Sequence, residues 1–121
     1  MSDIVLEPAI PILRIYDIAR AKEFYVDFLG FKVDWEHRFD DSAPLYMQVS
    51  RSGAKLHLSE HYGDGTPGTA VYIRGINIAA LSAELAAKHA RFARPCPTDK
   101  EPTITDPFGN MLRFDDESNR G

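Results

Sequence analysis

The feature that most constrains this chain is the alternating stretch over residues 54–61, which runs into a Gly-Asp-Gly turn. A β-strand points successive side chains to opposite faces, so Leu56 and Leu58 share one face while His57 and Ser59 share the other. A strand with one leucine face and one polar, titratable face separates a hydrophobic core from an open surface or a cavity. The chain is therefore expected to form a sheet with one buried face and one face available for function.

The predicted elements follow the same order in both halves of the chain. Asp17 and Asn77 are each predicted to cap a helix that follows a strand. The first half then reads as strands over residues 10–15, 31–39, 45–51 and 54–61, with a helix over about 18–29. The second half reads as strands over residues 70–74, 90–94, 102–105 and 111–115, with a helix over about 78–89. The order predicts one α+β domain over residues 1–121, built from two tandem βαβββ modules at about 8–61 and 69–115.

Bulk composition excludes several functional classes. The 121 residues are 44% hydrophobic and 26% charged, which is ordinary for a globular protein. The net charge of −4 argues against nucleic acid and is compatible with a cationic partner, although a solvated acidic surface is the preferred explanation. The single cysteine, Cys96, excludes an intrachain disulfide. No apolar run reaches membrane-spanning length and no signal peptide stands at the start, so we expect a cytoplasmic protein without membrane contact.

Four segments carry a resemblance to a known family: Ile-Leu-Arg-Ile-Tyr-Asp at 12–17, Ala-Lys-Glu-Phe-Tyr at 21–25, Phe-Leu-Gly-Phe at 28–31 and Thr-Asp-Pro-Phe-Gly-Asn at 105–110. Over residues 8–114 the chain resembles the vicinal oxygen chelate superfamily, also called the glyoxalase/bleomycin-resistance/dioxygenase superfamily. The segments 44–51 and 56–61 look most like its bleomycin-resistance branch. The resemblance implies a cupped, eight-stranded mixed sheet with helices outside, and a homodimer whose N-terminal strand is exchanged. Pro8 and Pro11 either stiffen such an arm or protect an edge strand.

The resemblance also implies where a metal would be held. Enzymes of the superfamily bind a divalent metal through positions that correspond here to Ile10, His57, Ala70 and Arg113. Isoleucine and alanine have no donor atom, and arginine is permanently cationic without a lone pair. One ligand out of four does not make a metal site. We therefore expect no metal and no cofactor at this place, and we lean against an enzyme.

Two other sequence patterns bear on possible chemistry. Residues 57–61 match the His-x-x-Glu-His sequence of some zinc peptidases, but that chemistry requires a helix. In a strand, Glu60 faces away from both His57 and His61. A weaker metal site that uses these histidines and His37 stays open. Cys96 lies between two prolines without a basic neighbour in sequence, so it does not read as a nucleophile.

The faces opposite the leucines are predicted to line a small-molecule pocket, because they mix flat aromatic rings with a few polar groups. The predicted ligand-binding residues are Trp35, His37, Phe39, Tyr46, His57, Ser59, Tyr72 and Arg113. By resemblance, Trp35 and Phe39 match places where bleomycin-binding proteins present aromatic rings to the planar rings of the drug. Trp35 as a core residue, and Arg113 paired with an internal carboxylate, are the alternatives.

The predicted function is non-catalytic: a homodimer that sequesters a planar, cationic small molecule of the bleomycin type. The cationic charge is inferred from four nearby carboxylates, those of Asp34, Glu36, Asp40 and Asp41, which otherwise form a solvated edge. One alternative is a metal-dependent glyoxalase or dioxygenase-like enzyme with displaced ligands. Another is a member with an unrelated ligand, because residues 95–106 lack the longer Gly- and Trp-containing segment that forms one lip of the crevice in relatives.

Overall fold

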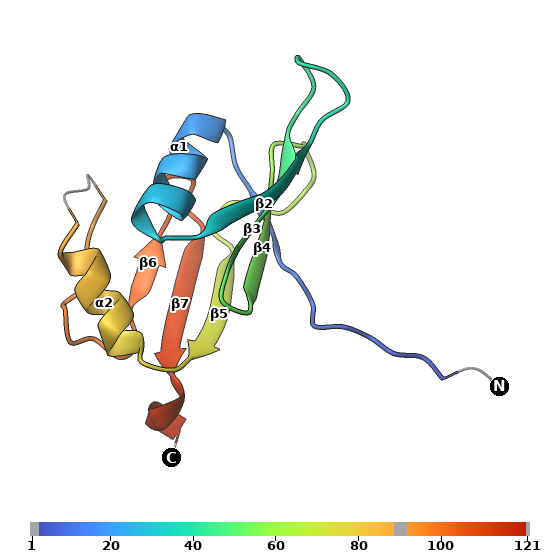
Figure 1. Cartoon of the computed structure of the whole chain (residues 1–121). Coiled ribbons are helices and arrows are strands. Elements are labelled where there is room, and N and C mark those ends of the chain that lie inside the picture. The colour runs from blue at the N-terminus through green and yellow to red at the C-terminus, as the bar shows by residue number, and fades with distance from the viewer. Residues whose placement is uncertain (1–2, 89–91, 121) are drawn as a thin grey trace.

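Two sheets organise the computed structural model, which describes residues 3–88 and 92–120 (Figure 1). The first sheet has the order β1-β4-β3-β2 and contains β1 (Ile12–Arg14), β2 (Lys32–His37), β3 (Tyr46–Arg51) and β4 (Ala54–Ser59). The second has the order β5-β7-β6 and contains β5 (Ala70–Gly75), β6 (Thr103–Thr105) and β7 (Met111–Asp116). β1 runs parallel to β4 and β5 parallel to β7, while the other pairs are antiparallel. The predicted α+β class is confirmed.

The second sheet is smaller than the sequence predicted. It has three strands within the described residues, because no strand forms over residues 92–94 and the rest of that predicted strand lies outside them. β6 is only three residues long. Pro95, Pro97 and Pro102 each lack an N–H group and so cannot donate to a ladder. The prolines thus account for the short pairing in this part of the chain.

The first helix begins and ends where the sequence indicated. It comprises α1 (Ile18–Lys22) and continues as a π-helical segment, η1 (Glu23–Phe28). The Asp17 carboxylate accepts the N–H of Arg20 at 3.0 Å, as expected of an N-cap. Gly30 follows with φ of +76°, and a Cβ there would lie 2.8 Å from Nη1 of Arg51. Within the described residues, no helix has the length and apolar character needed to cross a membrane.

The second helix, α2 (Ile78–Ala86), is capped differently from the prediction. Asn77 occupies the N-cap position but has a left-handed backbone, with φ of 62°, and its side chain makes no capping bond. A side-chain cap needs an extended residue there, whereas asparagine tolerates the left-handed conformation. Instead, Asp116 at the end of β7 accepts the N–H of Ile78 at 2.9 Å. Hydrogen bonds from the backbone N–H groups of Ser118 and Ile78 lower the pKa of Asp116 to about 2.

A β-bulge decides which side chains of β2 face the core. Simple alternation over residues 33–37 predicts Val33, Trp35 and His37 on one face, but Val33 lies on the face opposite Trp35. The register with β3 shifts between Val33 and Trp35, so that Val33 pairs with Val49 while Trp35 pairs with Gln48. A bulge inserts one residue and reverses the alternation beyond it. Val33 therefore packs against the core, and Trp35 turns to the other side of the sheet.

One hydrophobic core lies beneath both sheets. It is filled by residues that are at most 6% exposed, including Leu13, Met47, Val49, Leu56, Leu58, Phe24, Phe28, Leu112 and Phe114. Leu56 and Leu58 lie where the alternation of β4 predicted them. The two modules therefore share their interior.

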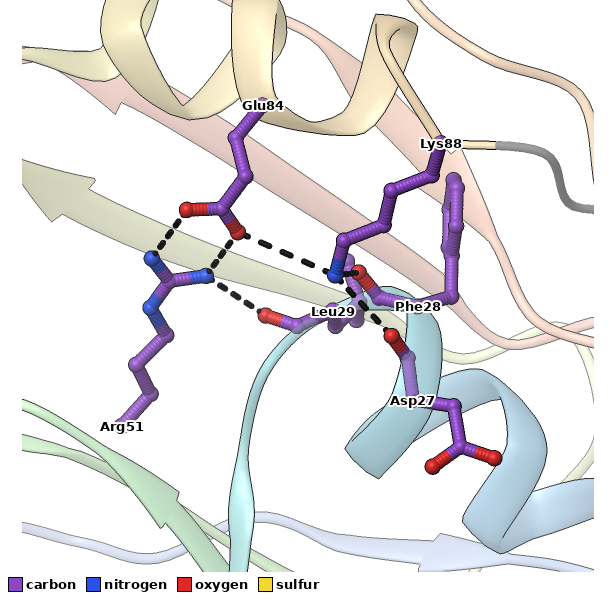
Figure 2. A network of polar contacts seen from close by, with 6 residues as sticks. All are labelled: Asp27, Phe28, Leu29, Arg51, Glu84 and Lys88. Atoms are coloured by element: carbon purple, nitrogen blue, oxygen red, sulfur yellow. Dashed lines mark hydrogen bonds and ion pairs between the residues drawn. The ribbon is translucent and has the colours of Figure 1, made fainter.

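A polar network joins the two modules at the end of the first helix (Figure 2). Arg51 of β3 donates two hydrogen bonds to the carboxylate of Glu84 on α2, at 2.8 and 2.9 Å. The same guanidinium donates to the carbonyl of Leu29 at 2.7 Å, and Lys88 Nζ donates to the carbonyl of Asp27 at 2.9 Å. Side chains of both modules thus satisfy carbonyls that a helix end leaves without partners.

The Asp-Pro-Phe-Gly-Asn turn has a structural role. Buried Asp106 accepts the hydroxyl of buried Tyr25 at 2.6 Å and the backbone N–H of Asn110 at 2.8 Å. The Asn110 amide in turn donates to the carbonyl of Arg14 at 3.0 Å. Burial, together with the Asp106 carboxylate, raises the pKa of Tyr25 well above its usual value. The turn fastens module two to the first helix and to β1.

Candidate functional site

The open face of the first sheet is the face turned away from the core. Its side chains are Ile12, Arg14, Trp35, His37, Tyr46, Gln48, His57 and Ser59. Strand register arranges them in two rows across β2, β3, β4 and β1: Trp35, Gln48, His57, Ile12 and His37, Tyr46, Ser59, Arg14. Paired residues of neighbouring strands point to the same side, so the members of each row lie on one face of the sheet.

Three rings form an aromatic cluster on this face. Trp35 and Tyr46 are stacked, with ring centres 6.0 Å apart and planes 9° from parallel. His57 meets both edge-on, at 5.3 Å from Trp35 and 5.1 Å from Tyr46. Trp35 is 42% exposed, so it is not a core residue. The cluster presents flat apolar surface to solvent in a fixed orientation.

A directional chain of hydrogen bonds holds the cluster. Tyr46 Oη lies 2.7 Å from Nδ1 of His57, whose Nε2 lies 3.0 Å from Oε1 of Gln48. Gln48 Nε2 donates to Asp34 at 2.9 Å, and Ser50 donates to the same carboxylate at 3.0 Å. An ionised carboxylate only accepts, so Gln48 turns its oxygen toward His57. His57 then carries its proton on Nε2, and Nδ1 accepts the Tyr46 hydroxyl.

The charges on this face follow from the same contacts. Burial lowers the pKa of His57 below its ordinary value, so the imidazole is neutral at pH 7. Burial, and then the Asp64 carboxylate, raise the pKa of Tyr46. Hydrogen bonds from Gln48 and Ser50 lower the pKa of Asp34. The cluster is thus electrically neutral, with one ionised carboxylate bonded at its β2 edge.

The family metal positions do not fit a metal. Both ring nitrogens of His57 are engaged within the protein. Ile10, Ala70 and Arg113 supply no lone pair. Across residues 3–88 and 92–120, no group of three or more His, Cys, Asp or Glu side chains is placed to hold an ion. The residues at these four positions therefore do not fit a metal ion.

The other predicted site residues are spread more widely. Phe39 is 89% exposed on the β2–β3 loop and contacts His37 edge-on, with ring centres 5.9 Å apart. Ser59 is fully buried, because its hydroxyl donates to Asp64 at 2.8 Å beneath the loop that follows β4. Tyr72 and Arg113 pair with each other on the second sheet. The structure thus brings Trp35, Tyr46 and His57 together, while Tyr72 and Arg113 lie apart on the other sheet.

Three of the four carboxylates expected to attract a cationic ligand have partners within the protein. Asp34 accepts from Gln48 and Ser50, and Glu36 pairs with Lys22 at 2.8 Å. Asp40 accepts from the hydroxyl and the backbone N–H of Ser42, at 2.7 and 2.9 Å. These contacts weaken their pull on a ligand. The cationic charge of the ligand stays a prediction.

A groove lies on another part of the molecule. It has a volume of about 600 Å³ and lies between the turn joining β3 and β4, strand β5 and helix α2. Of the eight predicted binding residues, only Tyr72 lines it. Its walls include Ala9 and Pro11 of the N-terminal segment, which extends away from the body in Figure 1. The aromatic cluster is an exposed surface, distinct from this groove.

Sequence reasoning placed Arg14 within the first strand but not in the site. Its Cζ atom lies 4.8 Å from the centre of the Tyr16 ring and 5.9 Å from that of Tyr62. The alternation of Ile12, Arg14 and Tyr16 against buried Leu13 and Ile15 is the signal that would have placed it on the open face.

Comparisons with known proteins agree with this fold. A family model described as "Glyoxalase superfamily protein" matches residues 1–121. No match was found among curated protein sequences. The bleomycin-binding protein of bleomycin-producing Streptomyces verticillus, solved with copper(II)-bleomycin, is 28% identical; 94% of this chain and 98% of that one are covered, with a TM-score of 0.67.

Two more distant structures are similar in fold alone. A member of the glyoxalase/bleomycin resistance protein/dioxygenase superfamily from Sphaerobacter thermophilus is 21% identical, with 93% and 100% of the two chains covered and a TM-score of 0.64. Glyoxalase I of Leishmania major is 18% identical, with 90% of this chain and 85% of that one covered and a TM-score of 0.64.

Proposed function

The chain belongs to the glyoxalase superfamily, and on that premise we propose that it is a non-catalytic protein that binds and sequesters a planar, antibiotic-like small molecule. The observation that carries the proposal is the cluster of Trp35, Tyr46 and His57 on the open face. Its rings are held by stacking and hydrogen bonds, yet Trp35 remains 42% exposed. Exposed, pre-positioned aromatic surface suits a flat ligand, because little ordering is required on binding.

Binding without catalysis fits the state of His57. Its two ring nitrogens already have hydrogen-bond partners within the protein. A general base or a metal ligand needs a nitrogen that can leave its present bond. Here, breaking either bond would also loosen the ring that Trp35 and Tyr46 pack against. The imidazole serves the proposal as part of a rigid surface.

A similar protein of known structure suggests bleomycin as the class of ligand. The Streptomyces verticillus protein, 28% identical to this chain, was solved with copper(II)-bleomycin. Sequestration of an antibiotic of this type is the function we propose, and metal-free bleomycin is the first probe. A cationic tail on the ligand would face Asp41, whose carboxylate lies on the exposed β2–β3 loop.

We also propose that a second copy of the chain completes the site. The open face is a surface rather than an enclosed pocket, and small-molecule sites usually bury most of their ligand. Ile4, Val5 and Leu6 are 84–87% exposed on the extended N-terminal segment. β5 pairs only with β7 among the described strands, which leaves its other edge, beside the groove, for a partner's segment. A Val5→Asp variant is expected to dissociate the dimer in analytical ultracentrifugation.

Trp35 allows a direct test of the proposed function, since it is the only tryptophan in the chain. Titration with metal-free bleomycin is expected to change its fluorescence saturably, at about one drug per subunit. Tyr46→Leu should weaken binding by roughly two- to tenfold, the cost of a lost aromatic contact. Phe39→Leu is the matched control, because Phe39 is exposed on the loop outside the cluster.

The outcomes separate the alternatives. No response in fluorescence and no heat in calorimetry would remove bleomycin from the function and favour an unrelated ligand. Equal loss of binding in the Phe39 and Tyr46 variants would place the drug on the loop instead of the cluster. Stoichiometric metal in protein purified without added metal would contradict the non-catalytic proposal.

A further inference from the structure

The second sheet has an open face of its own, on the side away from the core. Leu112, Phe114 and Ile104 are buried on its other side, so the side chains that alternate with them point outward. Register arranges these in rows across β5, β7 and β6: Ala70, Met111, Thr105 and Tyr72, Arg113, Thr103, followed by Arg74 beside Asp115. Tyr72 and Arg113, two predicted binding residues that lie apart from the aromatic cluster, are therefore direct cross-strand neighbours.

The Tyr72 ring is held in place while much of it stays exposed. Its hydroxyl donates to Oδ2 of Asp115 at 2.5 Å, and Asn119 donates to Oδ1 of the same carboxylate at 2.8 Å. Asp115 is only 5% exposed, whereas Tyr72 is 52% exposed. A buried carboxylate thus fixes a flat ring that faces solvent, so a ligand ring finds this surface already ordered.

The Arg113 guanidinium is exposed and has no acceptor. An internal carboxylate was the alternative partner that the sequence allowed, and Asp115 lies two positions along β7 on the same face. Both oxygens of Asp115 already accept hydrogen bonds, from Tyr72 and Asn119. Within residues 3–88 and 92–120, Arg113 takes part in no hydrogen bond or ion pair. Its five N–H donors therefore all face solvent or a ligand.

We propose that this face is a second ligand site, separate from the aromatic cluster, for a small aromatic oxyanion such as an aryl carboxylate, sulfonate or phosphate. The oxyanion pairs with Arg113, because a guanidinium offers its N–H groups in a planar fork that matches an oxyanion bidentately. The ring of the ligand packs against Tyr72 and the half-buried Met111. The inference goes beyond the proposed function and does not depend on it.

The charge of this face favours an anion over a cation. Arg74, the next outward side chain of β5, adds a second guanidinium, whose single hydrogen bond to the carbonyl of Glu117 is long at 3.4 Å. Asp115 is the one carboxylate in the rows formed by β5, β6 and β7, and it is bound to Tyr72 and Asn119. These rows thus carry two positive charges against one negative charge.

Arg113 also has a simpler explanation as a solvated surface arginine. That explanation predicts no difference at Tyr72 between an anion and a neutral compound of the same shape. The two accounts therefore differ in a measurement on the wild-type protein, before any substitution is made.

The test compares 2-naphthoate with 2-naphthamide, which share a ring system and nearly the same shape but differ in charge. NMR titration of the full-length protein at low salt gives the affinity from the backbone amides of Tyr72 and Arg113, so that any binding near Trp35 is observed separately. Naphthoate is expected to bind roughly two- to fivefold tighter, the value of an exposed ion pair.

Two variants locate the charge that causes this preference. In Arg113→Met the preference should disappear through loss of naphthoate affinity, with naphthamide unchanged. Arg20→Met, which removes an exposed arginine from α1, should keep the preference. Should the Arg113 variant fold poorly, the Nε–H resonance of Arg113 in the wild-type protein decides: it must shift on adding naphthoate and stay in place with naphthamide.

Three outcomes would overturn the inference: amides of Tyr72 and Arg113 that do not respond to naphthoate, equal affinity for the two probes, or a preference that survives Arg113→Met. Each of them would leave the proposed function standing, because that function is tested with bleomycin at the aromatic cluster.

Discussion

Replacing Tyr46 by phenylalanine is expected to raise the pKa of His57. Tyr46 Oη lies 2.7 Å from Nδ1 of His57, and as a donor there it stabilises only the neutral ring, since a protonated ring has no lone pair at that atom. Burial, the main cause of the lowered pKa of His57, is largely kept because phenylalanine preserves the neighbouring ring. The substitution therefore isolates one hydrogen bond.

The size of the effect follows from the type of bond. A hydrogen bond between neutral groups contributes about 0.5–1.5 kcal/mol, and one pKa unit corresponds to about 1.36 kcal/mol. The pKa of His57 should rise by roughly 0.4–1.1 units. The unfolded chain takes up this proton more readily than the folded one, so stability falls as the pH drops below 6.5, the ordinary value. That loss should be smaller in the variant.

Two-dimensional ¹H–¹⁵N NMR of the imidazole rings during a pH titration measures both the pKa and the position of the proton. The wild-type protein should show His57 protonated on Nε2 in the neutral form. Tyr62→Phe, at a residue that is 97% exposed, is the control and should leave His57 unchanged. A proton on Nδ1 of His57 in the wild-type protein, or a His57 pKa that stays unchanged or falls in Tyr46→Phe, would refute the donor and acceptor roles assigned to this series of hydrogen bonds.

Three further predictions concern stability. Tyr25→Phe removes a buried hydrogen bond to Asp106 and should lower the free energy of unfolding by about 1.5–3 kcal/mol in urea; a loss below about 0.5 would contradict the bond. Glu84→Gln breaks the half-exposed ion pair with Arg51 and should lower the free energy of unfolding by at most about 1 kcal/mol, and by less at high salt. The same loss in about 1 M salt would argue against an ionic origin. The pKa of Asp116 is lowered from 3.8 to about 2, so its carboxylate stabilises the fold above pH 3.8 and loses this effect as the pH falls through about 2. In Asp116→Asn, stability should therefore depend less steeply on pH in this range, as measured by acid unfolding followed by circular dichroism. An identical profile would contradict the capping role.

Local rules were enough to predict most of the fold. Alternation in β4 placed Leu56 and Leu58 in the core, and Asp17 capped its helix as its residue type indicates. Proline content accounts for the short β6. These features depend on a few neighbouring residues, which is why a single sequence reveals them.

The features that were wrong or missed depend on residues far apart in the chain. The β-bulge between Val33 and Trp35 places these two side chains on opposite faces of the sheet. The bulge depends on the register with β3, which lies elsewhere in the chain. Asp116 caps α2 from 38 positions away. Such partners have no signature within a short window of sequence.

The central claim is that the ligand lies on the aromatic cluster of the first sheet and not in the groove beside β5. The most direct measurement is the NMR shift of the Trp35 indole N–H, followed together with the backbone amides of Val71 and Ile73 in the groove, during titration with metal-free bleomycin. The account predicts a saturable shift at Trp35, with Val71 and Ile73 unmoved. Shifts confined to Val71 and Ile73 would contradict it and place the binding site in the groove.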